Sequence, residues 1–211
     1  MKQRSTKHRS TQQGSTKQRS SKQRSVRLRL MLAVVLCMAA PAMMAEVVDS
    51  SANGFTVKTT LSIKAAPDAV YRQIIRVGDW WDSAHTFSGD AHNLSIEEKP
   101  MGCWCEKLPN QGGVRHMEVV FLSPGKKLVM IGGLGPMQSM ATAGTMTFQL
   151  SPAEGGTRLE MTYTVAGYRA EGLNSLAAPV DSVLAQQCAR LKSFVETGRA
   201  APAAAQSSPR P

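Results

Sequence analysis

The C-terminal segment from Val180 to Gly198 is the feature that most constrains the fold of this chain. Counting from Val180, apolar residues stand at positions +3, +4, +8, +11, +14 and +15. This spacing predicts an α-helix with one wide apolar face. Pro179 suits the first helical turn, and Gly198 suits the position just beyond the last turn. Burial stabilises each large apolar side chain by about 1.5–3 kcal/mol, so another element must cover this face.

The residues that follow Gly54 supply the first strand and a short helical region. Residues 55–63 alternate strictly, with Phe55, Val57, Leu61 and Ile63 on one face, which predicts a half-buried strand. From Pro67 the period changes, and apolar residues at helical spacing predict a short helix that ends before Trp80, with a second helical part after it. Residues 83–92 are rich in Ser, Gly, Asp and His and are expected to form a loop.

The rest of the chain before the C-terminal helix is predicted to be all strand. Six further strands are expected at 93–98, 103–108, 114–122, 127–132, 144–150 and 157–167. Each break between them carries Gly or Pro, as hairpin turns do. Short turns favour antiparallel pairing, and a sheet with one apolar face needs one cover. We therefore expect an α+β domain in which a seven-stranded antiparallel sheet packs against the C-terminal helix.

The net charge of +10 is concentrated at the N-terminus. Residues 1–30 contain ten Lys and Arg residues and no acidic residue, which leaves 15 basic against 15 acidic residues in the remainder of the chain. Charge therefore gives no reason to expect nucleic-acid binding by the folded domain.

The N-terminal residues divide into a repeat and a secretion signal. Residues 1–25 are a basic five-residue repeat almost without apolar side chains, predicted to be disordered. The repeat is either a basic arm or an extension before a true start at Met31. Residues 26–45 have the positive flank, short apolar run and small residues of a signal peptide, cleaved after Ala42 or Ala45. The sequence thus predicts export to the periplasm or medium, with no stable membrane span after cleavage.

The remaining domain limits follow from the same patterns. Residues 46–54 are expected to be a linker, residues 55–198 the folded domain, and residues 199–211 a disordered Ala, Pro and Ser tail.

The order of elements resembles that of a known superfamily. Local strings at 80–86, 88–93, 102–106, 134–136 and 178–181 are similar to an exported bacterial branch of the START-like helix-grip superfamily, also called SRPBCC or polyketide cyclase-like. The resemblance covers roughly residues 55–198. It implies a curved sheet that grips the C-terminal helix, with an apolar cavity between them. One such fold hosts carriers, cyclases and hydrolases, so it does not by itself assign a function.

Three interpretations remain open for the cysteines. In a regular strand Cys103 and Cys105 share one face, and Trp104 and Glu106 share the other. Cα atoms two residues apart in such a strand are roughly 6.5–7 Å from each other, so a bond between these two cysteines would be strained. The thiols are small buried side chains, or Cys188 forms a disulfide with Cys103 or Cys105, or the two strand cysteines bind a metal with His85 and His116. No metal or cofactor is predicted.

Candidates for acid–base chemistry are His85, Glu106, His116 and Glu118. In a regular strand His116 and Glu118 point to the same side, where they form either a solvated face or a base and its orienting carboxylate. His85 lies in the loop expected at the cavity mouth, where it contacts a ligand or Glu106, or only holds the loop in place.

Seven residues are candidates for ligand binding. Trp80 and Trp81 point about 100° apart on a helix, so one is expected in the core and the other at the cavity or a partner surface. Gln187 lies inside the apolar stripe, where its amide needs either a backbone partner or the polar end of a ligand. The predicted set is Trp80, Trp81, His85, Glu106, Met137, Met140 and Gln187.

Three functions remain after this reasoning. The leading one is a non-catalytic, exported protein that binds a hydrophobic or amphipathic small molecule. The alternatives are an enzyme of cyclase, isomerase or hydrolase type that uses His85 with Glu106 or His116 with Glu118, and a cell-envelope module that binds a partner through an exposed Trp80 or Trp81.

Overall fold

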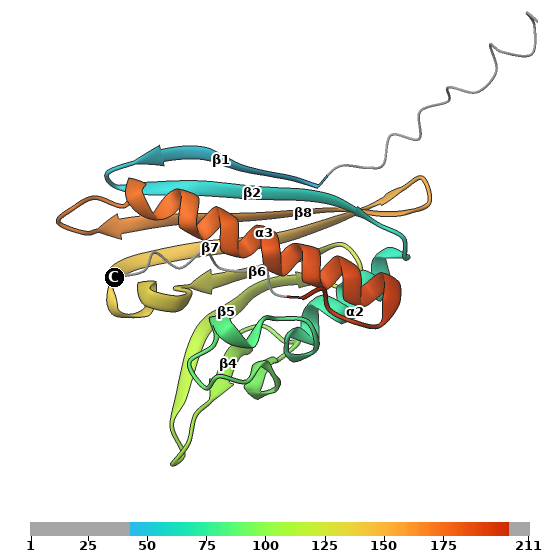
Figure 1. Cartoon of the computed structure of the whole chain (residues 1–211), viewed down its shortest axis with the longest axis horizontal. Helices are drawn as coiled ribbons and strands as arrows, with labels where there is room; N and C mark the ends of the chain where they lie inside the picture. The colour runs from blue at the N-terminus through green and yellow to red at the C-terminus, as the bar shows by residue number, and fades with distance from the viewer. Residues whose placement is uncertain (1–42, 203–211) are drawn as a thin grey trace, which may run out of the picture. The chain divides into compact units, whose positions relative to one another are not determined.

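The computed structural model describes residues 43–202, which form one antiparallel sheet and a long helix (Figure 1). The strands are β1 (Met44–Ser51), β2 (Gly54–Ile63), β3 (Leu94–Ile96), β4 (Cys103–Lys107), β5 (Gly113–Ser123), β6 (Lys127–Gly132), β7 (Ala141–Ala153) and β8 (Gly156–Tyr168). Their order across the sheet is β1-β2-β8-β7-β6-β5-β4-β3. The predicted repeat at 1–25, most of the predicted signal peptide and most of the predicted tail lie outside the described residues.

Within residues 43–202 the helical elements are two α-helices and four short 3₁₀ segments. The α-helices are α2 (Pro67–Ile75) and α3 (Asn174–Thr197). The 3₁₀ segments are η1 (Val77–Asp79), η2 (Ser83–His85), η3 (Ala91–Asn93) and η4 (Gly135–Ser139). Two short helices were predicted after the first strand. Only α2 is an α-helix there, and the other helical segments before β3 are 3₁₀ segments of three residues each. No helix among residues 43–202 is both long and apolar enough to cross a membrane.

The sheet has eight strands where seven were predicted, because residues 44–51 pair with β2. All eight residues of β1 are exposed, so this strand lacks the apolar alternation by which β2 was recognised. Its backbone hydrogen bonds to the edge of β2 hold it in the sheet. The expected linker at 46–54 was wrong for this reason, since most of it is edge strand.

Strands β2, β7 and β8 confirm the predicted alternation. In β2 every second residue is buried, including Phe55, Val57, Leu61 and Ile63. The inner faces of β7 and β8 add a further layer of large apolar residues such as Phe148 and Tyr163. One face of the sheet is therefore apolar and requires the cover that α3 provides.

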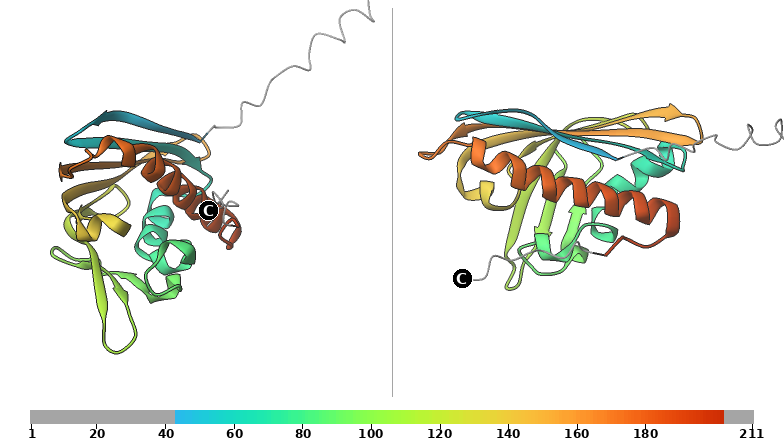
Figure 2. Two further views of the ribbon diagram at one scale, coloured as in Figure 1. Left: turned by 60° about the vertical axis from the view of Figure 1, so that its left-hand side comes forward. Right: turned by 45° about the horizontal axis from the view of Figure 1, so that its top comes forward.

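Helix α3 lies across the inner face of the sheet, and Figure 2 shows the sheet curving around it. The helix ends as predicted at Gly198, whose φ of 73° is left-handed. It begins at Asn174, five residues before Pro179, which was expected in the first turn, so Pro179 lies inside the helix. The proline deprives one carbonyl of its helical donor. Burial of Ala177 and partial burial of Leu176 offset that loss, because both pack against the core.

Candidate functional site

A cavity of about 500 Å³ lies between α3 and the part of the sheet that ends in β3 and β4. Its wall is mainly apolar, with two histidines and one threonine among the lining side chains. The lining residues are Trp81, Ala84, His85, Thr86, Phe87, Leu94, Trp104, His116, Leu134, Gly135, Pro136, Met137, Leu176, Pro179, Val180, Val183 and Leu184. Its size and composition are those of a small-molecule site.

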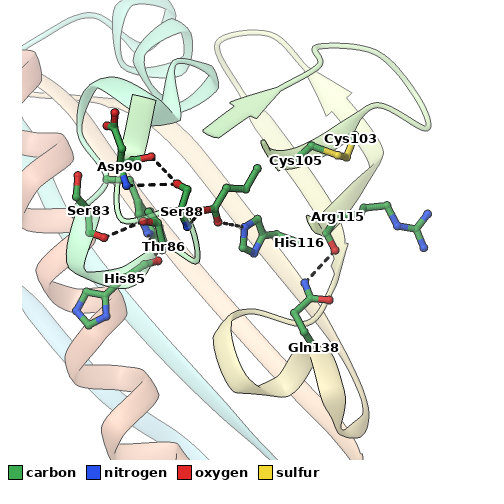
Figure 3. A network of polar contacts seen from close by, with 12 residues as sticks. Ser83, His85, Thr86, Ser88, Asp90, Cys103, Cys105, Arg115, His116 and Gln138 are labelled. Carbon is green, nitrogen blue, oxygen red and sulfur yellow. Dashed lines mark hydrogen bonds and ion pairs between the residues drawn. A yellow bond between two sulfur atoms is a disulfide. The ribbon is translucent and has the colours of Figure 1, made fainter. Parts of the chain in front are cut away.

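The polar centre of this wall is a buried carboxylate and imidazole. Glu106 on β4 and His116 on β5 are 1% and 5% exposed, and 2.9 Å separates Oε2 of Glu106 from Nε2 of His116. Oε1 of Glu106 accepts a hydrogen bond from the backbone N–H of Ser88. Figure 3 shows this network between the loop at 83–90 and strand β5.

A β-bulge turns His116 into the interior. Cys105 pairs with Arg115 but Trp104 pairs with Met117, so His116 is an extra residue in β5. As a result His116 and Met117 are buried side by side, which a regular strand does not allow. The bulge brings the imidazole to the face on which Glu106 lies.

The protonation states of this pair follow from their surroundings. Burial alone would raise the pKa of Glu106, but hydrogen bonds from Ser88, Phe87 and His116 outweigh it and lower that pKa. Burial lowers the pKa of His116 more than Glu106 raises it. At neutral pH the carboxylate is therefore charged and the imidazole neutral, and the shared proton stays on Nε2 of His116.

The structure pairs Glu106 with His116, and not His85 with Glu106 or His116 with Glu118 as the sequence suggested. Glu118 lies on the other side of β5 and forms an exposed ion pair with Arg115, 3.0 Å from Oε2 to Nη1. His85 lines the cavity, but its described hydrogen bonds are made through its backbone, which accepts from Nε1 of Trp81 at 3.0 Å. In Figure 3 the His85 ring points away from His116. The alternation rule failed because the bulge shifts the side of every later residue in β5.

The two neighbouring tryptophans have different places. Trp80 is 1% exposed and its Nε1 donates to the carbonyl of Gln73 at 2.7 Å, so it belongs to the core. Trp81 is 6% exposed, lines the cavity, and packs edge to face on Trp104 with ring centroids 5.2 Å apart. Neither tryptophan is exposed, so the predicted interface through an exposed Trp80 or Trp81 is not present on this structure.

The remaining predicted ligand residues divide between the wall and its surroundings. Met137 is buried and lines the cavity, whereas Met140 packs against the core beside it. Glu106 lies behind His116 and outside the lining set. Gln187 also lies outside that set: its Oε1 accepts the backbone N–H of Asp82 at 2.9 Å, so α3 holds the loop after Trp81.

The predicted disulfide of Cys188 was wrong, because Cys103 and Cys105 are bonded to each other. The register between β4 and β5 shifts between Trp104 and Cys105, and the Cα atoms of Cys103 and Cys105 are only 5.3 Å apart. The assumption of a regular strand, which placed them too far apart, therefore does not hold here. Cys188 is a buried free cysteine, and burial raises its pKa to about 12.

This bond also removes the metal site considered from the sequence, because neither sulfur is a free thiolate. Among residues 43–202 no group of three His, Cys, Asp or Glu side chains is placed to bind a metal ion.

Sequence reasoning missed Trp104 and most of the α3 residues that line the cavity. The alternation of β4 did place Trp104 on the same face as Glu106, which the structure confirms, but it could not tell that this face turns inward. The α3 residues Val180, Val183 and Leu184 were not among the predicted ligand-binding residues, but they line the cavity, so the stripe that predicted the helix also forms the cavity wall.

Comparison with known proteins shows the fold alone. No family model matches the chain, and no curated protein matches it significantly in sequence. An uncharacterised protein from Rhizobium leguminosarum has a similar structure, with a TM-score of 0.50 and 17% identity over 73% of this chain and 97% of that chain. Proteins from Mesorhizobium loti and Enterococcus faecalis, the latter a conserved protein of unknown function, have TM-scores of 0.49 and 0.48, each with 18% identity. The shares covered are 66% and 76% of this chain and 96% and 80% of theirs.

The fold and site together define an α+β protein with a long C-terminal helix on a curved antiparallel sheet and an apolar cavity between them. This arrangement is compatible with a helix-grip fold in general.

Proposed function

We propose that this protein binds a hydrophobic or amphipathic small molecule in the cavity between α3 and the sheet. The observation that carries the proposal is the cavity of about 500 Å³ with its largely apolar wall. Sites for small molecules combine such a wall with a few polar groups that fix the orientation of the ligand. Here His85, Thr86 and His116 are the polar lining residues.

Membership of the START-like superfamily and export belong to the same proposal. The helix-grip arrangement and the local strings at 80–86 and 102–106 support the superfamily. The disulfide between Cys103 and Cys105 supports an oxidising compartment, where such bonds persist. Fractionation of a bacterium that expresses the full chain, with the mass of the mature N-terminus, tests export: cleavage after Ala42 or Ala45 is expected, and an uncleaved cytoplasmic product contradicts it.

Titration with N-phenyl-1-naphthylamine, an uncharged fluorophore that brightens in apolar surroundings, tests binding. We expect saturable binding by the delipidated protein and a rise in its melting temperature, because a ligand that binds only the folded state stabilises it. Val183→Trp fills the cavity from α3 and is expected to weaken binding at least tenfold. Ser182→Trp adds the same side chain at the neighbouring exposed position and is the matched control.

Two results would contradict the proposal. One is equal binding by both tryptophan variants and the wild type, which places the dye elsewhere. The other is the absence of any bound molecule in native mass spectrometry of protein from its own host, together with no hit in a broad lipid screen.

A second candidate function is catalysis, and the Glu106–His116 pair favours it. A neutral imidazole whose Nε2–H is held by a buried carboxylate has the arrangement of a general base and its orienting group. Activity screening for cyclase, isomerase and hydrolase reactions tests this function. Turnover that is lost in both His116→Ala and Glu106→Gln supports it, and turnover that is unchanged in both variants rules out this pair.

A further inference from the structure

Two neighbouring side chains of the cavity wall carry buried polar atoms without a partner among the described residues. These atoms are Nε1 of Trp104 and Nδ1 of His116. The two rings have centroids 6.0 Å apart. An unpaired buried polar group costs about 1–3 kcal/mol, and native proteins leave few of them. Two such atoms on adjacent rings of one cavity therefore indicate a place for a polar group.

The hydrogen-bonding roles of these two atoms are fixed. An indole N–H is only a donor. The carboxylate of Glu106 receives the proton on Nε2 of His116, so Nδ1 carries the lone pair and is an acceptor. The missing group must therefore accept from Trp104 and donate to His116.

A hydroxyl group meets both requirements with one atom. At one hydroxyl oxygen the donated and the accepted hydrogen bond, each about 2.9 Å long, diverge by about the tetrahedral angle and join nitrogens roughly 4.5–5 Å apart. Two rings with centroids 6.0 Å apart allow such a spacing. An ether or ketone can accept from Trp104 but has no proton for His116. A carboxylate also has no proton for His116, and it would bring a second negative charge close to Glu106 in apolar surroundings.

The position of these atoms excludes bulk water as their ordinary partner. His116 is 5% exposed and Trp104 is 1% exposed. Phe87, which is 53% exposed at the cavity rim, stacks on the His116 ring with centroids 5.9 Å apart and shields it. A partner for the two nitrogens must therefore be held inside the cavity, where the hydroxyl of a ligand takes the place of an ordered water that has the same donor and acceptor roles.

We propose that the cavity selects apolar molecules that carry an alcohol or phenol hydroxyl, bound between Trp104 Nε1 and His116 Nδ1. The inference rests on the proposed binding function and specifies the class of ligand for the same cavity. Leu94, Val180 and Leu184 provide the apolar surface for the rest of the molecule.

The test compares 2-naphthol with its methyl ether, 2-methoxynaphthalene, by calorimetry on the wild-type protein. Two net hydrogen bonds predict that 2-naphthol binds about tenfold or more tightly than the ether. His116→Leu is expected to reduce this ratio to about one while the ether still binds, and Trp104→Phe to reduce it in part. His92→Leu, at an exposed histidine outside the cavity, is the matched control and should keep the ratio.

The outcomes separate the two proposals. If neither naphthalene binds and N-phenyl-1-naphthylamine also fails to bind, the binding function is wrong. If both naphthalenes bind the wild type equally, the cavity binds apolar molecules but the hydroxyl site is wrong. The wild-type ratio alone decides the second point, so the inference remains testable even where His116→Leu does not fold.

Discussion

Oε2 of Glu106 and Nε2 of His116 lie 2.9 Å apart in the interior, and neither residue is more than 5% exposed. The two residues come from adjacent strands and meet because His116 is the extra residue of a β-bulge. This contact links the loop at 83–90, strand β4 and strand β5, since the second oxygen of Glu106 holds the backbone of Ser88.

Removing the Glu106 carboxylate should destabilise the protein strongly. Glu106→Ala leaves the Nε2–H of His116 and the backbone N–H of Ser88 buried without a partner, at about 1–3 kcal/mol for each group. We expect a loss of about 3 kcal/mol in the free energy of unfolding, measured in urea, and a smaller loss for Glu106→Gln. Glu118→Ala is the control and should lose less than about 1 kcal/mol, because its ion pair with Arg115 is exposed. Equal losses at both positions would contradict the role given to Glu106.

Acid should weaken the fold through the same two residues. The pKa of His116 is lowered from 6.5 and that of Glu106 from 4.5. Unfolding restores both ordinary values, so the unfolded chain binds more protons and stability falls as the pH decreases. The contribution of His116 is lost as the pH falls below about 6.5, and that of Glu106 below about 4.5. Urea unfolding at about pH 7.5 and pH 5.5 should show this loss in the wild type and a smaller loss in His116→Leu; the opposite order would refute the assignment.

Thiol counting tests the cysteine arrangement. A protein that begins at Glu46 contains three cysteines. With Cys103 bonded to Cys105, Ellman's reagent should detect one thiol in denaturant and almost none in the native protein, because Cys188 is buried and its pKa is raised to about 12. Cys103→Ser should raise the denatured count to two and reduce stability by only about 1.5 kcal/mol, since the closed loop is short. A denatured count of one in the wild type together with a count of two in Cys188→Ser would instead show that Cys188 forms the bond.

Replacing Gln187 separates a structural from a ligand role. Its Oε1 holds the backbone N–H of Asp82, so Gln187→Leu should reduce the free energy of unfolding by about 1–2 kcal/mol with or without ligand. The affinity for N-phenyl-1-naphthylamine should change less than twofold, because Gln187 does not line the cavity. Lost binding with unchanged stability would move Gln187 into the site.

Most of the fold was predictable because its signals are local. The alternation of Phe55, Val57, Leu61 and Ile63 indicates a strand with one buried face. The spacing of Leu184, Cys188 and Leu191 indicates a helix with one buried face. Both patterns arise from fixed residue repeats of the backbone. Strand β1 was missed because all eight of its residues are exposed. Its sequence therefore has no apolar alternation that would indicate its pairing with β2.

The candidate site was only partly predictable. Trp81, His85 and Met137 were placed correctly at the cavity, and Glu106 and His116 were both recognised as acid–base candidates. The pairing of Glu106 with His116, and of Cys103 with Cys105, depended on where the register of β4 against β5 shifts. A bulge is defined by two residues of one strand facing one residue of its partner, so its position depends on the pairing of β4 with β5 in the folded sheet.

The sequence by itself thus determined three features: the spacing of apolar side chains in most strands and helices, the succession of strands along the chain from β2 onward, and the apolar stripe of α3. Only the tertiary structure decided which of these apolar surfaces pack tightly and which enclose a cavity, and which histidine faces the buried carboxylate. The physical reason is that side-chain periodicity is a property of neighbouring residues, whereas register and curvature depend on contacts between strands that are far apart in the chain.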